Sequence, residues 1–123
     1  MTLRRQFHEG RLTLQAVAAD GALLGHVVQR LAADESEIEW IEVSAAERRR
    51  GHGRTLMQEA MRAAAAAGAR TMYLEVRASN LAAQGLYQAL GFEVCGRREA
   101  YYTAPTEAAV LWRRDLSGFN FGP

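Results

Sequence analysis

The chain has 123 residues, which is enough for one folded domain, and we expect a single domain over residues 1–123. Its 49% hydrophobic and 24% charged residues are ordinary for a folded protein and exclude disorder along the whole chain. The 15 basic residues, all arginine, face 14 acidic ones, so the net charge of +1 excludes a general attraction to nucleic acid.

The first ten residues carry charge without an apolar run of signal-peptide length, and we expect an irregular tail there. Alternating apolar residues over 11–20 and 21–34 predict two strands joined by an Asp-Gly turn. A third strand is expected over 36–44. Because consecutive strands joined by short turns usually pair antiparallel, the first part of the chain predicts an antiparallel sheet.

The pattern then changes to a helical spacing. Over 53–67 a helix is expected, with an inner face made by Leu56, Met57, Ala60, Met61 and Ala64. A strand over 71–78 follows, and Asn80 is expected to cap a second helix that ends near Leu90. A strand, a helix and a further strand in succession predict one parallel pair inside the sheet.

Two more strands are expected over 92–102 and 108–116, and the tail 117–123 is expected to be irregular. Because Cys95 is the single cysteine, an intramolecular disulfide is excluded. Cys95 follows an apolar residue, and we expect it to be a small buried hydrophobic side chain. The elements together predict a mixed sheet with two helices, an α/β or α+β fold.

The segment "RRRGHG" at 48–53 stands between the third strand and the first helix. The first backbone amides of a helix lack internal partners and lie at the positive end of its dipole. Glycine at 51 and 53 would let a phosphate approach these amides. Short glycine motifs are not specific, so a plain helix start with solvated arginines remains an alternative. A basic patch over 48–54 that binds nucleic acid or another partner is a further alternative, against which the near balance of acidic and basic residues counts.

Read together, the motifs resemble the GCN5-related N-acetyltransferase (GNAT) superfamily, whose R/Q-x-x-G-x-G/A loop is matched by "RRRGHG". The segments "LEVRASN" (74–80) and "LYQALGFE" (86–93) resemble its later motifs, in order and at suitable spacing. With "RREAYY" (97–102), they are most similar to the bacterial ribosomal-protein-alanine N-acetyltransferases. The resemblance covers roughly residues 36–116 and implies a mixed, largely antiparallel sheet with helices on both faces.

The resemblance implies an acetyl-CoA site. The pyrophosphate would lie on the 49–54 loop, and the pantetheine would run between the strands at 38–44 and 71–77, which splay apart in this superfamily. The residues implied to bind the cofactor are Val43, Arg48, Arg49, Arg50, Gly51, His52, Gly53, Arg54 and Asn80. No His, Cys and Asp cluster has metal-ligand spacing, and no metal is expected.

Direct transfer to a primary amine needs a base for the ammonium and benefits from an acid for the thiolate. By resemblance, Glu75 is the candidate base and Tyr87 the candidate acid. A surface pair of Glu75 with Arg77 or another arginine of the sheet, and a core role for Tyr87, remain the alternatives.

Two further carboxylates and two tyrosines are candidates for the acceptor side. Glu39 and Glu42 are rival bases, which strand alternation places on opposite faces. Glu42, Tyr101 and Tyr102 are expected to contact the acceptor amine, although the tyrosines also fit an ordinary strand surface.

The expected function is acetyl-CoA-dependent N-acetylation of a peptide N-terminus or a small amine, in the cytoplasm, without a nucleic-acid or membrane partner. About ten residues precede the expected hairpin, so the family's N-terminal strand and helices are expected to be reduced. A non-catalytic acyl-CoA-binding module is therefore an alternative. A homodimer is expected from the short N-terminus and from Phe119 and Phe121 in the tail.

Overall fold

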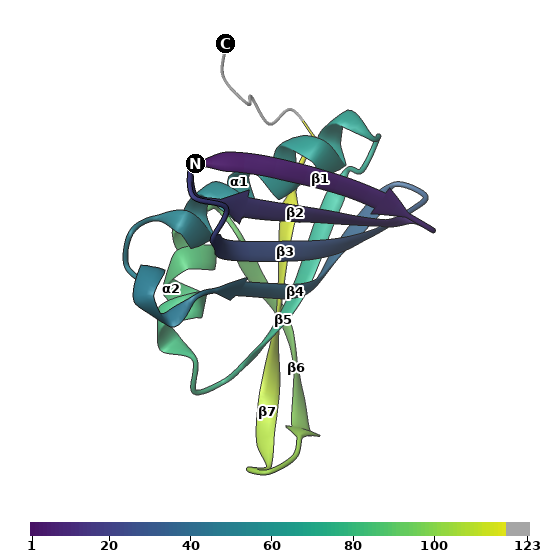
Figure 1. Cartoon of the computed structure of the whole chain (residues 1–123). Helices are drawn as coiled ribbons and strands as arrows, with labels where there is room; N and C mark the ends of the chain where they lie inside the picture. Colours follow the sequence, from purple (N-terminus) through teal and green to yellow (C-terminus); the bar gives the residue numbers. More distant parts are fainter. Residues whose placement is uncertain (118–123) are drawn as a thin grey trace.

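The computed structural model describes residues 1–117, which form seven strands and two helices (Figure 1). The helices are α1 (His52–Ala66) and α2 (Leu81–Ala89). The strands are β1 (Thr2–His8), β2 (Arg11–Val17), β3 (Leu23–Ala32), β4 (Glu35–Val43), β5 (Thr71–Arg77), β6 (Glu93–Tyr102) and β7 (Glu107–Asp115). They make one sheet in the order β1-β2-β3-β4-β5-β7-β6, in which β4 and β5 are the parallel neighbours. The predicted mixed, largely antiparallel sheet is confirmed.

The irregular tail expected at residues 1–10 is wrong, because residues 2–8 form the edge strand β1. Glu9 and Gly10 both have positive φ, 48° and 79°, and make a two-residue turn that pairs β1 with β2. Leu3 is the one β1 side chain that is even partly buried, so the strand is held by backbone pairing rather than by an apolar face. The tail from 118 onward, with Phe119 and Phe121, lies outside the described residues.

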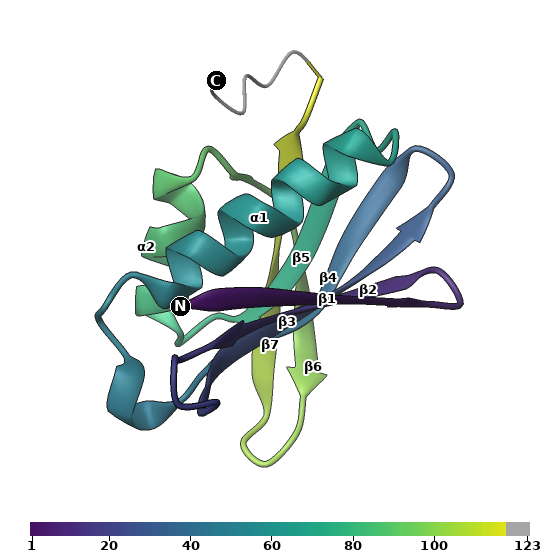
Figure 2. The ribbon, with the colours of Figure 1, turned by 45° about the horizontal axis from the view of Figure 1, so that its top comes forward.

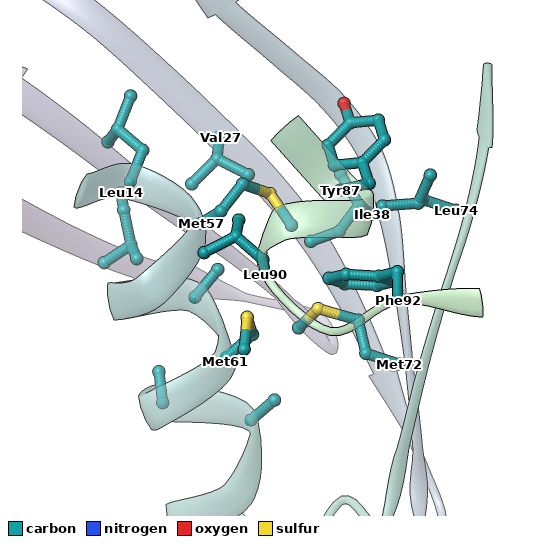
Figure 3. Packing of buried hydrophobic residues seen from close by; sticks show 14 of the residues in the cluster. Leu14, Val27, Ile38, Met57, Met61, Met72, Leu74, Tyr87, Leu90 and Phe92 are labelled. Atoms are coloured by element: carbon teal, nitrogen blue, oxygen red, sulfur yellow. The ribbon is translucent and has the colours of Figure 1, made fainter. Parts of the chain in front are cut away.

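Both helices lie on the same face of the sheet (Figure 2), which corrects the expectation of helices on both faces. The expected inner face of α1 is buried, and one apolar cluster joins it to α2 and to the strands beneath. Figure 3 shows Met57 and Met61 of α1 beside Leu90 and Phe92, which follow α2. We call the other face, which exposes Arg30, Glu37, Glu75 and Arg98, the open face.

A buried polar pair fastens α1 to the sheet. Gln29 on β3 donates from Nε2 to the Ala60 carbonyl of α1 at 3.0 Å, and Ser36 on β4 donates to Gln29 Oε1 at 2.6 Å. Both polar side chains are inaccessible to solvent. Each buried group is thus paired, as burial of polar atoms requires.

One extra residue in β4 separates it from β5. Val28 pairs with Trp40 and Gln29 pairs with Ile38, so Glu39 is an unpaired bulge residue. The parallel ladder to β5 ends at Ile38 and Leu74, after four residue pairs. A bulge bends a strand and increases its twist, and β5, β6 and β7 run steeply across the direction of β1–β4 (Figure 1). The strands therefore diverge, as the resemblance implies.

Cys95 is exposed, so the expectation that it is buried is wrong. It is the extra residue of a register shift between Val94 and Gly96 on β6, at the edge of the sheet. Within residues 1–117, neither helix is long and apolar enough to cross a membrane.

Candidate active site

A cleft opens where β4 and β5 stop pairing. Its volume is about 280 Å³, and its lining comes from both strands, from α2 and from the end of β6: Ile38, Glu39, Trp40, Ile41, Leu74, Glu75, Val76, Arg77, Asn80, Tyr87 and Tyr102. Backbone groups of β4 that face β5 beyond Ile38 have lost their strand partner. A ligand with amide groups can pair with such groups, which is how extended chains are bound at sheet edges.

The segment 48–54, here called the arginine loop, leads from the end of β4 into α1. Arg49 and Gly51 have positive φ of 65° and 81°, and Gly51 caps the helix. The first intrahelical partner is Thr55, whose amide donates to the Gly51 carbonyl at 3.0 Å. The amides that precede it are available to an anion at the positive end of the helix dipole.

The two glycines of the arginine loop have different roles. A Cβ added at Gly51 would meet nothing within 4 Å, so this position needs glycine for its φ. A Cβ at Gly53 would lie 3.5 Å from Leu86 and 3.8 Å from Val43. Gly53 therefore marks the place where α1, α2 and the end of β4 meet, next to the cleft.

The arginines of the loop differ in their contacts. Arg48 turns back and donates from Nε to the Val43 carbonyl at 3.4 Å, and so ties the loop to the end of β4. Arg50 pairs with Glu47, whereas Arg49 and Arg54 are exposed. The arginine loop thus presents positive charge and helix amides together, which suits a pyrophosphate.

Asn80 begins α2, and the predicted cap is confirmed. Its Oδ1 accepts from the Ala83 amide at 3.1 Å. Capping of α2 and contact with a cofactor would compete if both used the same atom of the Asn80 side chain. The cap uses only the Oδ1 atom. The Asn80 NH₂ group remains available as a donor at the cleft, which Asn80 also lines.

Tyr87 joins the core to the cleft. Its residue is 5% exposed, its ring packs against Phe92 with centroids 5.9 Å apart, and it lines the cleft. Figure 3 shows its hydroxyl pointing away from Met57, Leu90 and Phe92. Burial, and next the charge of Tyr102, raise the pKa of Tyr87, so the hydroxyl keeps its proton at neutral pH.

Glu75 lies on the open face of β5, where Arg98 and Tyr101 meet it. Arg98 is 3.6 Å from Glu75 Oε1. The Tyr101 hydroxyl donates to the Glu75 carboxylate, and this bond raises the pKa of Tyr101. The expected surface pair of Glu75 with an arginine is therefore present, and the partner is Arg98 rather than Arg77, which pairs with Glu107 at 3.4 Å.

The two tyrosines at the end of β6 form one side of the cleft entrance. Their rings meet edge to face at 5.1 Å, and the Arg77 guanidinium lies 4.3 Å from the Tyr102 centroid. Burial, and next the Glu75 carboxylate, raise the pKa of Tyr102. A hollow of about 280 Å³ beside the cleft is lined by both tyrosines together with Glu37, Ile38, Glu39 and Glu75.

Glu39 and Glu42 lie on the same face of β4, so the alternation that predicts opposite faces is wrong. The bulge at Glu39 shifts the pattern by one residue, and Glu42 pairs with His26 in the ladder. Arg11 donates to Glu39 at 2.6 Å and lowers its pKa. Glu42 accepts from Trp40 Nε1 and lines a separate hollow with His26 and Ser44. The structure therefore does not bring Glu42 to the cleft.

The site also contains groups that sequence-based prediction missed. Arg98, in the segment "RREAYY", received no role because the ion pair with Glu75 is formed across strands. Trp40 lines the cleft because the bulge precedes it. Within residues 1–117, no group of three or more His, Cys, Asp or Glu residues could hold a metal ion.

The chain is similar to known proteins in both its sequence and its fold. The Acetyltransferase (GNAT) family model matches residues 1–92. The ribosomal protein bS18-alanine N-acetyltransferase of Salmonella typhimurium LT2 is 36% identical over 86 residues, which are 70% of this chain and 58% of that protein. The chain spans 22%, 64% and 58% of the length of three curated relatives that it matches.

Two solved structures are similar over most of the chain. The ribosomal-protein-S18-alanine N-acetyltransferase of Escherichia coli superposes on this chain with a TM-score of 0.84 and 30% sequence identity. The match covers 93% of this chain and 74% of the Escherichia coli chain. Nourseothricin acetyltransferase has a TM-score of 0.81 and 32% identity, and covers 87% of this chain and 66% of that chain.

Proposed function

The chain belongs to the Acetyltransferase (GNAT) family, and from this membership we propose that it transfers an acetyl group from acetyl-CoA to a primary amine. The observation that carries the proposal is the cleft where β4 and β5 stop pairing, which the side chains of Glu75 and Tyr87 both line. When bound, acetyl-CoA supplies an activated thioester.

The arginine loop would hold the CoA pyrophosphate through the first amides of α1 and the arginine side chains. The unpaired backbone of β4 and the Asn80 NH₂ group would hold the amides of the pantetheine. The amide of Val43, at the end of β4, would face the thioester carbonyl and stabilise the negative charge that develops there.

Glu75 would remove the proton of the acceptor ammonium on the open face. Arg98 and Tyr101 contact the carboxylate and hold it on the open face, where the acceptor would approach. Tyr87 would give its proton to the departing thiolate from the other side of the sheet, because its raised pKa keeps it protonated.

The proposed acceptor is a peptide or protein N-terminus that begins with alanine. Its support is the similarity to the bS18-alanine N-acetyltransferases of Salmonella and Escherichia coli. Tyr101, Tyr102 and Glu39 would line its path. A small amine is the second candidate, since nourseothricin acetyltransferase is 32% identical and the open face carries no helix in residues 1–117.

The test is a calorimetric titration with acetyl-CoA, followed by turnover on an alanine-initiated peptide and on a panel of small amines. Micromolar binding and turnover on the peptide support the proposal. Turnover on amines alone would move the acceptor to the second class. Binding without transfer to any acceptor would support the non-catalytic module, and no binding by the folded protein would overturn the cofactor itself.

A further inference from the structure

Glu47 is the last residue of the short 3-10 turn Ala45–Glu47, directly before the arginine loop. Its Oε2 atom lies 3.4 Å from Arg50 NH1 and 3.4 Å from His52 Nε2. The side chains of Glu47 and His52 are only 24% and 17% exposed. One carboxylate oxygen therefore contacts two residues that would otherwise face a phosphate.

This carboxylate is itself an anion at the start of α1. His52 is the first residue of the helix, where the amides and the dipole attract negative charge. Arg48 is already turned to the Val43 carbonyl. Arg48, Arg50 and His52 of the arginine loop are thus held by the protein's own oxygen atoms.

We propose that Glu47 is a built-in competitor of the CoA phosphates, and this inference rests on the proposed function. In the CoA-free protein it holds Arg50 and His52. A phosphate that takes these partners must displace the Glu47 carboxylate or remain close to a like charge, and both lower the affinity.

The competition has a consequence for selectivity. A small anion such as inorganic pyrophosphate would be bound by the arginine loop alone. Glu47 would therefore compete with every contact that this anion makes. CoA would also be held by the cleft, where Glu47 makes no contact. Glu47 therefore lowers the affinity for both anions by a similar factor or more, so that only CoA, which also has the cleft contacts, keeps appreciable binding, and it speeds the release of CoA after transfer.

The experiment is calorimetric titration of wild type and Glu47→Gln with CoA and, separately, with inorganic pyrophosphate. Gln keeps the size of the side chain and removes its charge. We expect the Kd for CoA to fall about 3- to 10-fold in the variant, the size expected for loss of one partly exposed charge contact. The Kd for pyrophosphate should fall by at least the same factor, and CoA should dissociate more slowly.

Glu59→Gln is the matched control, because Glu59 pairs with Arg62 further along α1 and has the same charge change. Its Kd for CoA should stay within about twofold of wild type. An unchanged or weaker affinity in Glu47→Gln overturns the inference alone, as does an equal gain in Glu59→Gln. If CoA binds to Glu47→Gln but not to the wild type, the inference and the proposed function are both supported. If CoA binds to neither the wild type nor Glu47→Gln, the proposed function is overturned together with the inference.

Discussion

Glu75 and Tyr87 reach the cleft from opposite sides of the sheet. Glu75 extends from the open face of β5, beside Arg98 and Tyr101, whereas Tyr87 comes from the helix that covers the other face. An acceptor and a thioester could therefore approach from separate directions and meet between the strands. The proton would leave the acceptor on one side of the sheet and reach the thiolate on the other.

Replacing Glu75 by Gln removes the proposed base with little change in size. We expect kcat to fall by about 10²- to 10⁴-fold, while the Kd for acetyl-CoA stays near the wild-type value because Glu75 is not part of the arginine loop. Steady-state kinetics and calorimetry check the two quantities separately.

Glu35→Gln is the control for this change, because Glu35 begins β4 and does not line the cleft. It should keep wild-type turnover. Equal activity of Glu75→Gln and Glu35→Gln would remove Glu75 as the base and leave Glu39 as the remaining carboxylate at the cleft.

Replacing Tyr87 by Phe keeps the packing against Phe92 and removes the hydroxyl. Turnover should slow by about 10- to 10⁴-fold if the hydroxyl protonates the thiolate. Tyr73→Phe on β5, which does not line the cleft, is the control. A wild-type rate for Tyr87→Phe, measured with saturating acetyl-CoA, would leave Tyr87 with a packing role only.

The motif residues Glu75, Asn80 and Tyr87 line one cleft, whereas strand alternation placed Glu39 and Glu42 on the wrong faces relative to each other. Asn80 was recognisable as a cap because the preference for Asn before a helix is local. The shared face of Glu39 and Glu42 could not be predicted, because a bulge is visible only when β4 is paired with β3. The contact between Arg98 and Glu75 likewise depends on β6 and β5 being placed around β7.

Among the elements, the Gln29–Ser36 pair joins helix α1 to strands β3 and β4. Ser36→Ala would leave the buried Gln29 Oε1 atom without a donor. We expect the free energy of unfolding, measured in urea, to drop by about 1–3 kcal/mol.

A control variant and a double variant test whether the loss in Ser36→Ala comes from the buried pair. Ser44→Ala should change little, because that side chain makes no capping hydrogen bond. The double variant Gln29→Met, Ser36→Ala removes both partners and should cost less than the sum of the two single changes. A Ser36→Ala protein as stable as Ser44→Ala would show that the buried pair contributes nothing measurable.

Helix α1 and strand β1 show why some elements were predictable and others were not. The three-to-four spacing of Leu56, Met57 and Ala60 specifies a buried helical face, and α1 begins and ends within one residue of the prediction. Strand β1 buries almost no side chain, so it has no apolar pattern to find. Its turn at Glu9 and Gly10 also lacks the usual Asn-Gly or Asp-Gly signal.

For the whole molecule, composition and periodicity predicted the layers but not which face the helices cover. An apolar stripe indicates that a helix packs on a sheet, and it does not say on which side. Both helices follow connections that return to the same face, so the open face exposes charged pairs such as Arg30 with Glu37.

A homodimer remains a prediction at this scale. The edge strands β1 and β6 leave backbone groups unpaired, which favours association with another chain. Sedimentation velocity over a range of concentrations should show twice the 13.6 kDa chain mass, and the double variant Phe119→Ser, Phe121→Ser should lower that mass. A concentration-independent mass of one chain would contradict the dimer.

The bulge at Glu39 makes the opening between β4 and β5 depend on the number of residues in β4. Deleting this residue would let β4 continue its regular ladder with β3 and stay alongside β5 past Leu74. The sheet would gain hydrogen bonds and the passage between the strands would close. In a library of variants, single-residue deletions here should be recovered among well-folded, inactive proteins, whereas substitutions at Glu39 should keep the passage. Evolution of this scaffold is then constrained at this point by the number of residues in β4 as well as by their chemistry.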